Sequence, residues 1–128
     1  SNVILDIFTE DKQWFQWSSE TLSEYAEKTN IYINNIIYAE ISNAFDSIED
    51  LESAIPEDFL RTEIPWEASF LAAKVYQQYR RQGGIKSRPL PDFFIGAHAA
   101  VAGYSILTRD PKPYQHYFCK LKIISPSH

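Results

Sequence analysis

The spacing of apolar residues predicts several amphipathic helices in the first half of the chain. Either Asn34 or Asn35 is expected to cap a helix over 36–45, and Ser47 begins a further helix. The positions of that further helix that are spaced for burial are Ile48, Leu51, Ala54 and Ile55. A longer helix is predicted over 11–28, with most of its large apolar residues on one side, namely Trp14, Phe15, Trp17, Leu22, Tyr25 and Ala26.

Proline and glycine mark the helices of the second half. A helix over 65–82 is expected to have Pro65 at its first helical position and to end at the glycine pair 83–84. A second helix over 91–102 is closed by Gly103. Both predictions rest on the fixed backbone of proline at helix starts and on the freedom of glycine at helix ends.

Short β-branched runs over 31–33, 105–108 and 122–125 predict strands, and a proline-rich turn is expected after the second run. The apolar segment 3–8 fits either a strand or the start of a helix. Strands that alternate with helices are typical of an α/β domain around a parallel sheet. The length of 128 residues predicts a single domain over 1–128.

Composition narrows the class of protein. Hydrophobic residues make up 45% of the chain and aromatic residues 15%, which is enough for a folded core. The single cysteine, Cys119, excludes an internal disulfide and a cysteine zinc cluster, so we expect a reducing, cytoplasmic setting. No apolar run approaches the roughly 20 residues that span a bilayer, and no signal-peptide pattern is present, so we expect no membrane association.

Charge is divided unevenly along the chain. The formal net charge of −5 hides a segment over 1–60 with 13 acids and 2 bases, a net of −11. The segment over 61–128 has 4 acids and 10 bases, a net of +6. Such asymmetry indicates an anion-binding face that is separate from an acidic one.

Two acids lie on or near apolar helix stripes, where a carboxylate calls for an explanation. Glu40 is expected among the core-facing residues of its helix, with a place at the edge of the stripe, or a pairing with a base, as the alternative. Asp92 is close to the positive end of a helix dipole, which also fits ordinary charge complementation. The stripe that Asp92 heads consists of Ile95, Gly96, Ala99 and Gly103.

Asp110 follows a predicted strand, and the carboxyl ends of parallel strands are where sites are built, although an acid before Pro111 also suits a plain turn. Asp6 is read mainly as a first-turn helix acid. If Glu40, Asp92 and Asp110 meet at one sheet edge, their repulsion calls for a cation. Oxygen ligands of this kind suit Mg²⁺ or Mn²⁺. His98 is expected to be a packed or exposed side chain rather than a ligand.

Four motifs occur in order along the chain. They are SNVILD at 1–6, IYINNIIYAEIS with Glu40 at 31–42, PDFFIGAHAAVAG with Asp92 at 91–103, and SILTRD with Asp110 at 105–110. Together they resemble the PIN-domain ribonucleases, most closely the VapC-type toxins of bacterial toxin–antitoxin pairs. The resemblance covers nearly the whole chain. It implies a three-layer α/β/α fold with a central parallel sheet.

The resemblance also implies a Mg²⁺- or Mn²⁺-dependent endoribonuclease. Asp92 and Asp110 correspond to metal ligands, and Glu40 corresponds to a ligand or to a base that orients the water. Asn2 and Thr108 are expected to hold ligands or water by hydrogen bonds. The first metal-binding Asp of the family, with the central strand that it ends, would fall immediately before Ser1, so we expect the sequence to begin a few residues into the native chain.

The implied partners are an RNA substrate, a cognate antitoxin and a second copy of the chain in a homodimer. The rings of Trp14, Phe15 and Trp17 fit either the interface of such a dimer or the core. Tyr104, Tyr114 and Tyr117 suit either base stacking or the core. An alternative function is a non-catalytic PIN-like module that binds RNA or protein. Basic side chains are expected near the acids, where they either bind phosphates or are simply solvated charges on the surface. They are Arg80, Arg81, Lys86, Arg88, Arg109, Lys112, Lys120 and Lys122.

Overall fold

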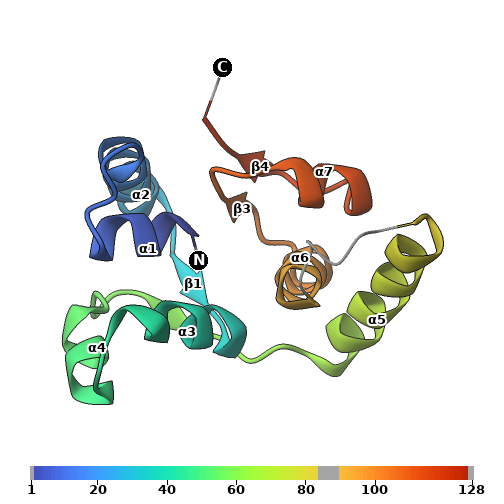
Figure 1. Cartoon of the computed structure of the whole chain (residues 1–128), viewed down its shortest axis with the longest axis horizontal. Coiled ribbons are helices and arrows are strands. Elements are labelled where there is room, and N and C mark those ends of the chain that lie inside the picture. The colour runs from blue at the N-terminus through green and yellow to red at the C-terminus, as the bar shows by residue number, and fades with distance from the viewer. Residues whose placement is uncertain (1, 84–89, 127–128) are drawn as a thin grey trace. The chain divides into compact units, whose positions relative to one another are not determined.

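The computed structural model describes residues 2–83 and 90–126 and divides into two compact units. Unit 1 comprises Ser1–Glu63 with Pro126–His128, and unit 2 comprises Ile64–Ser125 (Figure 1). The change of charge along the chain follows this division, because unit 1 has 14 acids and 3 bases and unit 2 has 3 acids and 9 bases. None of the described helices is both long enough and apolar enough to traverse a bilayer.

Unit 1 combines short helices with one parallel pair of strands. In that pair Tyr32 lies opposite Leu60 and Ile33 opposite Arg61. The expected strand at 31–33 is confirmed, its partner strand was not anticipated, and the ambiguous segment 3–8 is helical. The elements are α1 (Asn2–Phe8), α2 (Phe15–Lys28), β1 (Tyr32–Ile33), α3 (Asn35–Ile41), the 3₁₀ helix η1 (Ser42–Ala44), α4 (Ile48–Ala54) and β2 (Leu60–Arg61).

Polar side chains set where the helices of unit 1 begin. Oδ1 of Asn34 accepts the Ile37 N–H at 2.9 Å, which decides the cap of α3 in favour of Asn34. The predicted helix over 36–45 was too long, because η1 tightens the chain after Ile41. The predicted start of α2 at residue 11 was too early, since Oδ1 of Asp11 accepts backbone N–H groups ahead of the helix.

The core of unit 1 is a cluster of aliphatic residues with one ring. Its buried members are Ile4, Ile33, Ile41, Leu51, Ile55 and Phe59. Ile48, which was expected to be buried, is 60% exposed, and Phe15, whose ring fitted either the core or an interface, is 39% exposed. Each is the first residue of its helix. Helical side chains point toward the N-terminus, so a side chain at that position projects beyond the packed turns.

Unit 2 is built on two long helices and a second parallel pair of strands. Ile106 lies opposite Ile123 and Leu107 opposite Ile124, so the strands expected at 105–108 and 122–125 are confirmed. The parallel pairs in both units, with helices between strands, agree with the expected α/β class. The elements of unit 2 are α5 (Trp66–Arg81), α6 (Leu90–Ala102), β3 (Ile106–Leu107), α7 (Lys112–Tyr117) and β4 (Ile123–Ile124).

Two proline predictions in unit 2 need correction. Pro65 is the cap of α5 rather than its first helical residue, because its backbone is extended and its carbonyl accepts the N–H groups of Ala68 and Ser69. The expected turn after β3 is instead the helix α7, which Pro111 precedes. Pro113 is tolerated there because the first turn of a helix needs no intrahelical N–H donors.

Aromatic rings and one glycine join the helices of unit 2. The Phe93 ring of α6 lies 5.4 Å from that of Tyr76 and 5.3 Å from that of Tyr79, centroid to centroid. A Cβ added at Gly96 would overlap the Phe118 ring, so this glycine permits close packing. Gly103, expected in the buried stripe, is exposed, because it follows α6 with a φ of +77° that ends the helix.

Candidate active site

Asp110 lies just beyond the carboxyl end of β3. The residue is half-buried, and its backbone N–H donates to Oγ1 of Thr108 at 3.1 Å. Thr108 is buried, and its own N–H donates to the Ile124 carbonyl of β4 at 3.0 Å. The hydroxyl of Thr108 therefore holds the chain at the point where it turns away from the β3–β4 ladder. In parallel sheets this edge is where functional residues gather.

Asp92 is in the first turn of α6, where the positive end of the helix dipole stabilises an ionised carboxylate. The residue is half-buried. Ile95, Gly96 and Ala99 are buried, which confirms these three positions of the stripe that Asp92 heads. Both Asp92 and Asp110 thus belong to unit 2 and are partly shielded from solvent.

Glu40 belongs to unit 1, at the second-to-last position of α3. The next residue, Ile41, is completely buried, whereas Glu40 is half-buried. This difference places Glu40 at the edge of the apolar stripe, one of the two positions that the sequence left open. Its carbonyl accepts Nδ2 of Asn43 at 3.2 Å, which helps to end the helix.

The N-terminal helix contains a buried carboxylate that the sequence underrated. Asp6 is 2% exposed, and its Oδ2 accepts the hydroxyl of Ser18, which is fully buried, at 2.9 Å. This bond links α1 to α2. Asn2 is half-buried at the start of α1. The signal in the sequence was an acid inside the apolar run VILDIF, which only a buried polar partner makes tolerable.

The chemistry of the donors decides which metal fits. Within each unit, taken over the residues that the structure describes, no three His, Cys, Asp or Glu side chains are grouped as a metal site. The candidate donors Glu40, Asp92 and Asp110 are all carboxylates. Carboxylate oxygens suit Mg²⁺ and Mn²⁺, whereas zinc favours nitrogen and sulfur. In either unit, the chemistry of these side chains therefore suits a hard divalent cation better than zinc.

His98 is a packed side chain, which is one of the two placements, packed or exposed, that the sequence left open. It is 3% exposed on α6, and its ring lies 5.6 Å from that of Tyr104. Burial lowers the pKa of the imidazole below its usual value of 6.5 because a charged ring would lose its hydration. A neutral, enclosed imidazole of this kind contributes to packing.

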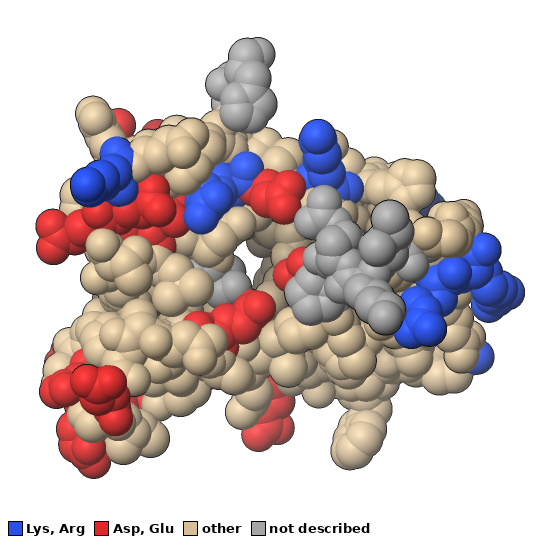
Figure 2. All heavy atoms as spheres, viewed as in Figure 1, with Lys and Arg blue, Asp and Glu red and all other residues tan. Residues whose placement is uncertain are grey.

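The candidate phosphate-binding residues fall into two groups. Arg80 and Arg81 are exposed in the last turn of α5, and the Arg80 guanidinium lies 5.9 Å from the centre of the Tyr76 ring. Arg109 is half-buried beside Asp110, while Lys112 is exposed at the start of α7. Lys86 and Arg88 lie outside the described residues. Figure 2 shows blue side chains over the C-terminal part of α5.

The three tyrosines proposed for base stacking have different surroundings. Tyr114 is 7% exposed and belongs to the core. Tyr117 is half-buried, with its ring 5.7 Å from that of Tyr79 and 5.6 Å from that of Phe93. Tyr104 is half-buried against His98. The core interpretation is therefore correct for Tyr114 and is favoured for Tyr117.

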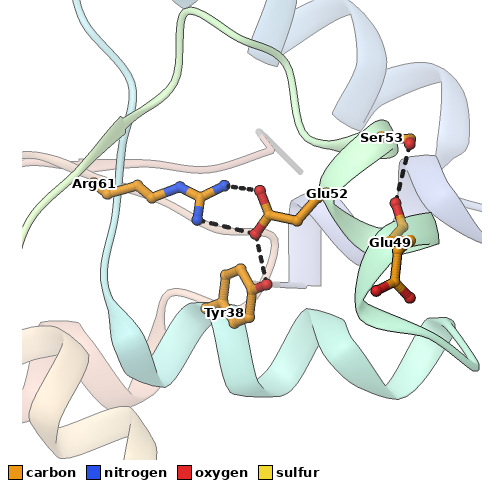
Figure 3. A network of polar contacts seen from close by, with 5 residues as sticks. All are labelled: Tyr38, Glu49, Glu52, Ser53 and Arg61. Atoms are coloured by element: carbon orange, nitrogen blue, oxygen red, sulfur yellow. Dashed lines mark hydrogen bonds and ion pairs between the residues drawn. The ribbon is translucent and has the colours of Figure 1, made fainter.

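A polar cluster that the sequence did not suggest joins α3, α4 and β2 (Figure 3). The Arg61 guanidinium binds both carboxylate oxygens of Glu52, at 3.0 and 2.6 Å, and the Tyr38 hydroxyl donates to Glu52 at 2.6 Å. The guanidinium also lies 5.4 Å from the centre of the Tyr38 ring. The three residues are far apart in the sequence, so no local pattern predicts the cluster.

The cluster shifts the protonation of its own members. The hydrogen bond from Arg61, followed by the one from Tyr38, lowers the pKa of Glu52 below 4.5. The hydrogen bond to Glu52 raises the pKa of Tyr38 above 10.0. Because Tyr38 is on α3, two residues before Glu40, this cluster helps to fix the helix that carries the candidate acid.

Comparisons with known proteins identify the family and the fold of the chain. The model of the PIN domain family matches residues 1–118 of the chain. A comparison with curated proteins finds no match. A solved structure that resembles this chain is the crystal structure of VapBC2 from Rickettsia felis bound to a DNA fragment from their promoter, with a TM-score of 0.75 and 15% identity, covering 98% of this chain and 95% of that chain. This likeness concerns the fold, and it confirms the predicted α/β class.

Proposed function

Because the chain belongs to the PIN domain family, whose model matches residues 1–118, we propose that it is a Mg²⁺- or Mn²⁺-dependent endoribonuclease. The proposed setting is the cytoplasm, where residues 1–128 act as one domain and as the toxin of a toxin–antitoxin pair. The observation that carries the proposal is the pair of half-buried acids in unit 2, with Asp92 in the first turn of α6 and Asp110 beyond the carboxyl end of β3.

Asp92 and Asp110 are the proposed metal ligands. Asp92 lies in the first turn of α6, where the helix dipole favours negative charge, and the Thr108 hydroxyl fixes the backbone of Asp110. When bound, a divalent cation supplies Lewis acidity and neutralises negative charge at the scissile phosphodiester. Ligands that are held before the metal arrives lose little entropy on binding it, which favours a defined geometry.

Glu40 has the proposed role of a further ligand or of a base. As a base it accepts a proton from the water that attacks phosphorus, while the bond from phosphorus to the leaving oxygen breaks. Asn2 is proposed to orient water or a ligand by hydrogen bonding. The cluster of Tyr38, Glu52 and Arg61 supports Glu40 by fixing α3.

The proposed RNA contacts are Arg and Lys side chains near Asp92 and Asp110. Among the described residues, Arg109 and Lys112 lie on either side of Asp110 in the sequence, and the guanidinium groups of Arg80 and Arg81 are exposed in the last turn of α5. Cationic side chains neutralise phosphates and make RNA binding dependent on salt. Lys86 and Arg88, outside the described residues, are proposed to act in the same way.

A cognate antitoxin is the proposed protein partner. Support comes from the similar fold in the structure of VapBC2 from Rickettsia felis, which was solved bound to a DNA fragment from their promoter. The antitoxin is proposed to cover the acidic site and so to block RNA. Addition of the antitoxin in equimolar amount is therefore expected to stop cleavage.

The deciding experiment is cleavage of a panel of single-stranded RNAs by the full-length protein with Mg²⁺ or Mn²⁺. Asp92→Asn keeps the size of the side chain and removes its charge, so cleavage is expected to fall at least about 100-fold. Asp58→Asn, at an exposed position outside the site, is the matched control and should cleave normally. Equal cleavage by wild type and Asp92→Asn would overturn the mechanism. RNA binding without any cleavage would favour the non-catalytic module.

A further inference from the structure

A groove lies at the amino end of the β3–β4 ladder, and its walls are the end of α6 and the turn before β4. The residues that line it come from within 99–105 and within 118–122, so the groove belongs entirely to unit 2. Its volume is about 380 Å³. Small-molecule sites in proteins have volumes of about 300–1,000 Å³, so the groove is large enough for a single small ligand.

Backbone hydrogen bonds fix both walls of the groove. Gly103 has a φ of +77° and turns the chain out of α6, and the N–H of Tyr104 then donates to the Ala99 carbonyl at 2.9 Å. In the other wall, the N–H of Leu121 donates to the Phe118 carbonyl at 3.0 Å. Walls that are formed before a ligand arrives reduce the entropy that is lost on binding.

The groove is remote from the two acids of unit 2. The N–H of Ile106 donates to the Lys122 carbonyl at 3.0 Å, which places Lys122 beside the amino end of β3, whereas Asp110 lies beyond the carboxyl end. Asp92 is in the first turn of α6, and Gly103 follows its last residue, 11 positions later. At about 1.5 Å per residue, this separation is about 16 Å along the helix axis. The groove is therefore separate from the candidate active site.

One wall of the groove is cationic. Lys120 and Lys122 both line the groove, both are exposed, and they are two residues apart in the chain. Among residues 2–83 and 90–126, no carboxylate forms an ion pair with either lysine. Two ammonium groups in this situation attract an anion that has more than one negative charge, and phosphate groups meet that requirement.

The opposite wall offers hydrogen-bond acceptors. Ala100 lines the groove and is one of the last four residues of α6, whose carbonyl groups have no partner within the helix. This end of the helix dipole is negative, so it repels phosphate and attracts N–H donors. The groove is thus polarised, with acceptors on one wall and cations on the other. A ligand that matches it has N–H donors at one end and phosphate at the other.

Two aromatic side chains complete the lining. Tyr104 is half-buried, and its ring makes a T-shaped contact with that of His98, with the centroids 5.6 Å apart. Phe118 is 8% exposed. Aromatic side chains stack on the planar bases of nucleotides. Together with the acceptors and the cations, these rings indicate a nucleotide whose base carries an amino group.

We propose that this groove binds a free adenine nucleotide, with the base beside Tyr104 and the end of α6 and the phosphates at Lys120 and Lys122. The adenine amino group supplies N–H donors for the helix carbonyls, and the two-ring base stacks on the tyrosine. The groove volume is near the lower limit for small-molecule sites, which suits one nucleotide rather than a strand.

The bound nucleotide is a ligand of the protein and not the substrate of cleavage. In this groove its base lies about 16 Å from Asp92 along α6, because the groove is at the opposite end of that helix. The proposal goes beyond the nuclease proposal and does not depend on it, since binding is measured without metal and without RNA.

The test is calorimetric titration of the full-length protein with adenosine 5′-diphosphate (ADP) in EDTA. ADP is expected to bind, whereas adenosine, which lacks the phosphates, and inorganic pyrophosphate, which lacks the base, should each bind at least about tenfold more weakly. No binding at about 1 mM ADP would overturn the proposal. Equal affinity for ADP and pyrophosphate would show attraction by charge alone and would also reject a nucleotide site.

Variants assign the two ends of the ligand. Lys120→Gln and Lys122→Gln are each expected to raise the dissociation constant for ADP at least about tenfold. Lys74→Gln, which removes the same charge at an exposed position of α5, is the matched control and should bind ADP normally. Tyr104→Leu should weaken ADP binding and leave pyrophosphate binding unchanged, with circular dichroism confirming that each variant is folded. ADP binding that none of the groove variants weakens contradicts the proposal.

Two further measurements exclude other locations and ligands. ADP binding that Asp92→Asn abolishes would place the nucleotide at the candidate active site, and the proposal would be wrong. The binding of a single-stranded RNA oligonucleotide is compared in the same lysine variants. If Lys120→Gln and Lys122→Gln weaken RNA binding and leave ADP binding unchanged, the groove belongs to RNA and the proposal is rejected.

Discussion

The backbone N–H of Asp110 donates to Oγ1 of Thr108 at 3.1 Å, and Thr108 itself is 3% exposed. A buried side chain therefore holds the segment that carries a proposed metal ligand. This hydrogen bond uses the backbone of Asp110 and not its carboxylate. Residues that orient a metal ligand in this way commonly contribute about 10- to 100-fold to metal affinity or activity.

Thr108→Val removes the acceptor while it keeps the volume of the side chain. We expect the Mg²⁺ concentration for half-maximal RNA cleavage to rise about tenfold, because Asp110 is no longer held in place. Thr108→Ser retains the hydroxyl and is expected to restore most of the affinity for Mg²⁺. A purely structural role would lower stability in both variants without changing the metal requirement, and circular dichroism together with a Mg²⁺ titration separates the two results.

Metal binding should be visible without any RNA. A ligand that binds the folded chain alone raises its stability, by about 2.7 kcal/mol at a concentration 100 times the dissociation constant. Mg²⁺ is therefore expected to raise the unfolding temperature of the wild type, and EDTA to reverse the change. Asp92→Asn and Asp110→Asn should lose this response, whereas Asp58→Asn should keep it. An equal rise in all four proteins would show that these acids bind no metal.

Helix caps and strand runs were predictable because they depend on local chemistry. Asn34 and Ser47 each accept a backbone N–H three residues later, as their place before an apolar stretch predicts. The helix α7 was missed because prolines 111 and 113 suggest a turn. The partner strand β2 was missed because Leu60 and Arg61 form a run too short to recognise, and their pairing with β1 is non-local.

The candidate acids could be selected from the sequence, but their surroundings could not. Asp92 was recognised because it heads a stripe of small residues, and burial of Gly96 against Phe118 agrees with that pattern. The hydrogen bond from the Asp110 N–H to the Thr108 hydroxyl depends on the path of the chain after β3, which the sequence does not specify. Asp6 was underrated because its partner Ser18 is on another helix.

The stability that Glu52 supplies should disappear in acid. Its pKa is lower in the folded chain than the ordinary 4.5, so the carboxylate stabilises the fold above that pH and loses its effect as the pH falls through the lower value. Glu52→Gln is expected to lower the unfolding temperature at pH 7, and the difference should shrink as the pH is lowered below 4.5. Glu57→Gln, also exposed in unit 1, is the control. A difference that stayed constant with pH would show that the charge of Glu52 is unimportant.

Gly96 is expected to tolerate no side chain while Phe118 keeps its ring. In a helix interior, alanine is intrinsically better than glycine by about 1 kcal/mol. At this position a Cβ would overlap the Phe118 ring, and overpacking of a core costs about 1–3 kcal/mol, so Gly96→Ala should lower the free energy of unfolding in urea. Combined with Phe118→Leu, the same change should cost less than it does alone, because the smaller side chain leaves room for the methyl group. Equal costs in both backgrounds would show that the ring does not limit this position.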